Sequence, residues 1–265
     1  MDGHGAGQIT MYAAALVCVL LYEGTFGRDT PITFIGLYLK SWRRSIAGFL
    51  TFAAISSLIS SIAILLMIAM GSVVFNPEAI ASLSMNAITA LLISMPIASV
   101  LALVEESMFR AFMLRYLRWN ASLATTITAI LFSSFVFALV HNLSDLLGWL
   151  EPKMMQLFIG LFVLGVILSV VYISTGSLLC AVGLHAGFLF VEHERLYTQS
   201  VAFTGDQWWM AVDGDVRTAP VTWLIFALIG LGIFLARHQL HPRFAIETPV
   251  LASSDVTEPF TLEQR

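Results

Sequence analysis

The sequence predicts an all-α protein, a polytopic membrane helix bundle with about seven transmembrane helices. Of its 265 residues, 58% are hydrophobic and only 11% are charged. A helix needs about 20 apolar residues to cross the hydrocarbon core of a bilayer, and several uncharged stretches reach that length. This composition excludes an ordinary soluble domain. A net charge of -4 with scattered basic residues predicts no nucleic-acid partner.

The clearest candidate spans are long stretches without a charged residue. They cover residues 46–75, 85–104, 121–140 and 218–236. The run 154–191 is too long for one span and is interrupted by Ser-Thr-Gly-Ser at 174–177, which predicts two helices joined by a tight turn. A shorter apolar run at 9–22 completes the expected set of spans.

Basic residues predict how the bundle is oriented. Lysines and arginines are enriched in loops that face the cytoplasm, which predicts cytoplasmic segments at Arg28, Lys40, Arg43 and Arg44, at Arg110, Arg115 and Arg118, and at Arg237 and Arg243. We expect a single transmembrane domain over residues 1–246, with a motif-bearing core at 85–192. The polar, acidic tail at 247–265 is expected to be disordered.

Two adjacent glutamates, Glu105 and Glu106, lie in a stretch that is otherwise uncharged from residue 85 onward. An ionised carboxylate at bilayer depth costs about 2.5 to 3.5 kcal/mol, so such residues indicate a functional site. Helical residues four apart share a face, which pairs Glu106 with Arg110 and turns Glu105 roughly 100° away, toward a cavity. The alternative is a solvated helix end at the cytoplasmic interface.

Two histidines follow in later apolar stretches. His141 ends one of them, with Phe137 one turn earlier on the same face and Asn142 next to it as a candidate donor or helix cap. His185 lies among glycines and alanines, which permit close helix approach or leave space for a substrate. Each histidine alone is more often a packing or interfacial residue. Together with the acid pair, they predict a shared site for acid and base chemistry.

These motifs, in this order, resemble the intramembrane endopeptidases grouped as CAAX proteases and bacteriocin-processing proteins (CPBP). The motif E-E-x-x-x-R stands at 105–110, F-x-x-x-H stands at 137–141, and a third motif begins at His185. In many members that third motif continues to an asparagine or similar residue four positions on, where this chain has Leu189. The resemblance covers residues 85–192.

The resemblance implies an enzyme that hydrolyses a peptide bond of a membrane-associated protein or peptide, within the lipid bilayer of a bacterial cytoplasmic membrane. It implies that Glu105 and His141 activate a water and that His185 stabilises the oxyanion. The supporting residues would be Glu106, Arg110, Phe137 and Asn142. No cofactor is expected and no metal ligand is assigned. A zinc-dependent, metalloprotease-like variant would use Glu105, His141 and His185 as ligands, since histidine nitrogen and glutamate oxygen suit zinc.

Two other classes of function stay open. Leu189 cannot donate a hydrogen bond, which favours a non-proteolytic membrane adaptor or regulator that keeps a degenerate site as a structural core. A small transporter could use buried carboxylates as a proton relay, since such sites often hold intramembrane acids. The chain shows none of the internal repeats that many transporters have.

Overall fold

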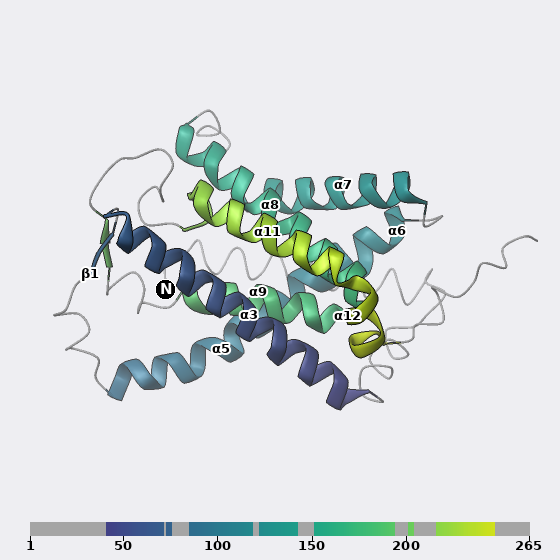
Figure 1. Ribbon diagram of the computed structural model, residues 1–265, viewed down its shortest axis with the longest axis horizontal. Coiled ribbons are helices and arrows are strands. Elements are labelled where there is room, and N and C mark those ends of the chain that lie inside the picture. Colours follow the sequence, from purple (N-terminus) through teal and green to yellow (C-terminus); the bar gives the residue numbers. More distant parts are fainter. Residues whose placement is uncertain are drawn as a thin grey trace, which may run out of the picture.

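The computed structural model describes residues 41–71, 73–75, 85–118, 122–142, 151–193, 201–203 and 216–246. Within these ranges the chain is a bundle of crossing helices with one short two-stranded ribbon at its edge (Figure 1). The predicted span at 9–22 and the predicted disordered tail at 247–265 lie outside the described residues.

The helices follow the predicted spans closely. They are α3 (Trp42–Ala69), α5 (Met85–Glu106), α7 (Leu123–His141), α8 (Pro152–Thr175), α9 (Leu178–His193), α11 (Pro220–Leu235) and α12 (Arg237–Phe244). A π-helix, η1 (Ser107–Leu114), and the short α6 (Arg115–Leu117) continue α5. The 3₁₀ turn η3 (Val216–Thr218) precedes α11, and strands β1 (Val73–Phe75) and β2 (Val201–Phe203) pair antiparallel.

Within the described part of the chain, three helices are long and apolar enough to cross a membrane: α3, α7 and α8. The pair α11 and α12, bent by 75°, makes four if it is counted as one span. α9 is a shorter apolar helix, and the 22-residue α5 occupies the predicted span at 85–104. The helical membrane architecture is therefore confirmed, whereas the count of seven spans stays a prediction.

The long apolar run after residue 154 folds as the sequence predicts. α8 ends at Thr175, and Gly176 follows in the left-handed conformation with φ 63°. A glycine at this position closes a helix without the steric strain that a side chain would add. α9 begins two residues later, so the predicted tight turn between two helices is confirmed.

The predicted span at 46–75 is wrong at its end. α3 stops at Ala69, Gly71 takes a left-handed φ of 73°, and Val73–Phe75 forms strand β1 against β2 from the loop before α11. Valine and phenylalanine favour strands as readily as they favour apolar helices, so hydropathy alone did not separate the two.

Two glycines bring α9 into direct contact with α3. A Cβ added at Gly183 would overlap the carbonyl oxygen of Phe49, and one at Gly187 would overlap the carbonyl oxygen of Ala53. Ser57 Oγ also donates a hydrogen bond to the Gly187 carbonyl at 3.3 Å. Because His185 lies between the two glycines along α9, this contact with α3 fixes its height in the bundle.

We expect Gly187→Ala to destabilise the protein by about 1 to 3 kcal/mol, because the added methyl group must push α3 away from α9. The matched control is Gly232→Ala on α11, where a Cβ would meet no atom within 4 Å. That variant should be neutral or slightly stabilising, since alanine favours helix more than glycine does. Thermal unfolding of the purified variants in detergent measures both effects. Equal melting temperatures for the two would contradict the close contact.

Candidate active site

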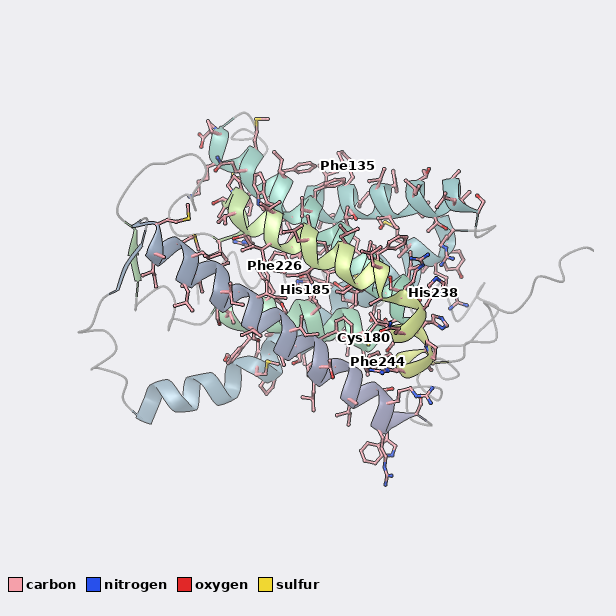
Figure 2. All side chains as sticks on the ribbon, viewed as in Figure 1. Phe135, Cys180, His185, Phe226, His238 and Phe244 are labelled. Carbon is pink, nitrogen blue, oxygen red and sulfur yellow. The ribbon has the colours of Figure 1, made fainter. Side chains whose placement is uncertain are left out.

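The sequence-predicted residues from three helices meet inside the bundle. Glu105 and Glu106 end α5, His141 ends α7, and His185 lies in the middle of α9. The side chains of Glu105, Glu106 and His185 are 8%, 0% and 3% exposed, and that of His141 is 16% exposed. Figure 2 shows His185 surrounded by packed helices. This burial does not fit the alternative of a solvated helix end.

Arg110 forms the predicted ion pair and also connects three helices. Its Nη1 donates to Glu106 Oε1 at 2.9 Å, and its Nη2 donates to the Gly165 carbonyl of α8 at 3.0 Å. The guanidinium carbon lies 4.8 Å from the centroid of the Phe137 ring on α7, a cation–π contact. Arg110 therefore neutralises one buried carboxylate and holds the end of α5 against α7 and α8.

Phe137 contacts both imidazoles. Its ring centroid lies 4.5 Å from that of His141 and 5.9 Å from that of His185, and the side chain is fully buried. The F-x-x-x-H spacing puts Phe137 one helical turn before His141, so its ring packs beneath the imidazole. The supporting position predicted for Phe137 agrees with these contacts.

His185 contacts both glutamates through different nitrogens. Its Nδ1 lies 2.9 Å from Glu106 Oε1, and its Nε2 lies 3.7 Å from Glu105 Oε2. An ionised carboxylate only accepts hydrogen bonds, so the Nδ1 of His185 carries the proton and donates to Glu106. Glu106 therefore orients His185 besides pairing with Arg110. The sequence did not predict the contact between Glu106 and His185, because 79 positions separate the two residues.

His141 approaches the same carboxylate oxygen of Glu105 as His185 does. Its Nδ1 lies 2.8 Å from the Phe137 carbonyl oxygen, so Nδ1 donates there, and Nε2 lies 3.5 Å from Glu105 Oε2. The gaps from Glu105 to the two imidazoles exceed the 2.7 to 3.2 Å of a direct hydrogen bond involving nitrogen. They are too short for a water on the line between the two atoms, so a water shared by these atoms would lie to one side of that line.

Asn142 and Leu189, the two other positions considered for the oxyanion site, have different surroundings. Asn142 follows the last residue of α7, and its Nδ2 donates to the Ala138 carbonyl at 2.8 Å, as a helix cap does. Leu189 packs in an apolar cluster with Ala102 and Ala186. The position four residues after His185 therefore supplies no hydrogen-bond donor.

Zinc dependence stays a prediction. Across the described ranges, no group of three or more histidine, cysteine, aspartate or glutamate residues has an arrangement that could hold a metal ion.

The central part of the sequence matches a known family. Residues 86–191 match the model of the Rce1-like family, described as type II CAAX prenyl endopeptidase. The Rce1-like segment contains all three motifs and every residue of the cluster, and it confirms the resemblance to CAAX proteases. No curated protein and no solved structure matches the chain. A protease family of membrane proteins and several apolar helices together indicate a multi-pass membrane protein.

Proposed function

We propose that this protein is an intramembrane endopeptidase in which Glu105 and His141 activate a water for attack on a peptide bond. The substrate would be a membrane-associated protein or peptide. The observation that carries the proposal is the buried position of Glu105 Oε2, 3.5 Å from His141 Nε2 and 3.7 Å from His185 Nε2. The Rce1-like family supports the protease class.

The two groups nearest to the proposed water are both hydrogen-bond acceptors. His141 Nδ1 donates to the Phe137 carbonyl, so Nε2 of this ring, when it carries no proton, is a second acceptor beside Glu105 Oε2. A water that lies beside both atoms would be polarised by them, which directs its own lone pair to a substrate carbonyl. As the oxygen attacks the carbonyl carbon, its proton passes to Glu105. That proton then goes to the leaving amine as the C–N bond breaks.

His185 is the candidate donor to the oxyanion. Because its Nδ1 proton is directed to Glu106, donation from Nε2 requires protons on both nitrogens. In that state Nε2 would donate to the negative oxygen of the tetrahedral intermediate and stabilise it.

The function is tested in cells that carry either the natural chain or Glu105→Gln. Comparing their membrane proteomes and secreted peptides should reveal precursors that accumulate uncut only in the variant. The termini of the missing products identify the cleavage site. They also distinguish a prenylated C-terminal tail, the substrate type in the family's description, from a peptide precursor or sorting signal. Identical processing in both strains would contradict proteolysis by this site.

Leu189 provides a test by gain of function. One oxyanion donor typically supplies about 100- to 1,000-fold in rate, so Leu189→Asn should raise the cleavage rate by up to about 100-fold. The matched control is Leu179→Asn, which places the same amide against the same apolar cluster, six residues before His185 rather than four residues after it. Steady-state rates of the purified variants on one substrate give the comparison. Equal rates for Leu189→Asn and Leu179→Asn would contradict an oxyanion beside His185.

Metal removal gives a further prediction. Since no described cluster suits a metal ion, incubation with EDTA or 1,10-phenanthroline should leave the cleavage rate within about two-fold of its initial value. The measurement is the activity of purified protein before and after chelation, with its zinc content followed in parallel. Loss of activity that zinc restores would support the metalloprotease variant instead.

The apolar surroundings of Leu189 favour one alternative, a non-proteolytic adaptor that keeps the cluster for structure. An adaptor needs the fold but not the water. The double variant Glu105→Gln/His141→Gln separates the two functions, because it removes the proposed base and its partner with little change in volume. Full cellular function with that variant would support the adaptor, and loss of function in a folded variant would support the protease.

A further inference from the structure

A second recess lies between the ends of four helices, away from the acid–histidine cluster. This groove has a volume of about 520 Å³, within the usual range for small-molecule sites. The apolar residues that line it come from three helices: Ile127 and Ile130 of α7, Val170 and Ile173 of α8, and Phe234 of α11. Its surface is mainly apolar, so it suits a hydrocarbon chain.

One end of the groove is basic. Arg237, His238 and His241 of α12 line it. In the part of the chain that the structure describes, no acidic residue lines the groove. Thr126 of α7 also lines the groove, and its Oγ1 accepts a hydrogen bond from Arg118 Nε at 2.9 Å. The groove therefore combines an apolar interior with hydrogen-bond donors and positive charge at its mouth.

The bend between α11 and α12 creates this arrangement. α12 turns 75° away from α11, and its Leu240 and Phe244 pack against the main core while His238 and His241 are exposed. Arg44 at the start of α3 donates to the Ala245 carbonyl at 3.0 Å and fastens the end of this helix. A helix with an apolar inner face and a basic outer face is typical of the membrane interface. The positive-inside rule assigns this end to the cytoplasmic leaflet.

The groove is separate from the candidate active site. Ile130 precedes His141 by eleven residues on α7, which corresponds to about 16 Å along the helix axis. Figure 2 likewise shows His238 at the α11–α12 bend, well away from His185 in the interior. A ligand in the groove would therefore leave the water and substrate positions unobstructed.

We propose that the groove binds one anionic phospholipid of the cytoplasmic leaflet. An acyl chain occupies the apolar part between α7, α8 and α11. The phosphate lies at the basic side chains of α12, where Arg237 supplies positive charge and His238 and His241 supply further donors. Basic pockets between transmembrane helices on the cytoplasmic side are suited to such headgroups. A zwitterionic lipid would satisfy the apolar part but would not match the positive mouth.

The test measures lipid binding to the delipidated full-length protein. Phosphatidylglycerol and phosphatidylcholine with identical acyl chains are titrated separately, and bound lipid is counted by native mass spectrometry. We expect one phosphatidylglycerol to bind at least about five-fold more tightly than phosphatidylcholine, the preference that one basic residue provides at an anionic lipid. Equal affinity for the two lipids would overturn the proposal.

Three variants localise the effect. Arg237→Gln should remove most of the preference for phosphatidylglycerol over phosphatidylcholine. Ile127→Trp should fill the apolar part of the groove and block the acyl chain, while the basic side chains stay in place. Ile127 is 47% exposed, so the larger ring is accommodated without repacking the core. The matched control is Arg43→Gln, which removes an exposed positive charge at the start of α3. An unchanged preference in Arg237→Gln, or an equal loss in Arg43→Gln, would show general surface attraction and overturn the site.

Discussion

Purified Glu105→Gln protein is expected to cleave its substrate about 100- to 10,000-fold more slowly than the natural chain, the usual contribution of a general base. Glutamine keeps the size of the side chain and the contacts of the buried position, but it does not accept a proton at neutral pH. The fold should therefore persist while hydrolysis stops. The measurement is the single-turnover rate with saturating enzyme, which excludes effects of substrate affinity.

The control for this variant is Glu151→Gln, which makes the same change from carboxylate to amide at an exposed position just before α8. It should retain full activity and an unchanged melting temperature. Thermal unfolding of Glu105→Gln should also show a folded protein, so that lost activity reports chemistry. A Glu105→Gln rate within about ten-fold of the Glu151→Gln rate would remove Glu105 from the proposed mechanism, since a general base usually contributes more.

Arg110→Met is expected to have the largest effect on stability. It leaves Glu106 buried and without its cationic partner, and removing one member of a buried ion pair typically costs about 3 to 5 kcal/mol. The contacts of Arg110 with the Gly165 carbonyl and the Phe137 ring are lost as well. We expect a melting temperature far below that of the natural chain, or failure to accumulate in the membrane. Arg43→Met, at an exposed position, should behave like the natural protein.

A double variant separates stability from chemistry. Glu106→Gln/Arg110→Met removes both charges, and replacing a whole buried pair with neutral residues is often tolerated. Much of the lost stability should return, while cleavage should stay low because a neutral amide orients His185 less effectively. A double variant as unstable as Arg110→Met would show that Arg110 acts mainly through Gly165 and Phe137.

Local patterns in the sequence predicted much of the fold. The helices α7, α8 and α9 lie where uncharged apolar runs are found, and the turn at Gly176 follows from a glycine among small polar residues. The strand β1 was missed because its pairing with β2 joins segments far apart in the chain. The 75° bend into α12 was missed too, because basic residues after a span indicate only a loop and do not predict a further helix.

The sequence indicated which residues form the candidate site, but not which residues they contact on other helices. Spacing alone gave the Glu106–Arg110 pair, since residues four apart meet on a helix. The contact of His185 with Glu106 and the bond from Arg110 to the α8 backbone depend on how helices pack, which no local pattern records. The π-helix directly after Glu106 has no sequence signature either, although such segments are frequent at functional sites.

The most direct test is a double-mutant cycle on the cleavage rate with Glu105→Gln, His141→Ala and both together. If the two side chains hold one water, each single change already loses that water, and the double variant should be little slower than the slower single variant. Independent roles would instead multiply the two losses. A water held by both Glu105 and His141 predicts strong non-additivity in the cycle. Multiplied losses in folded variants would contradict a shared water.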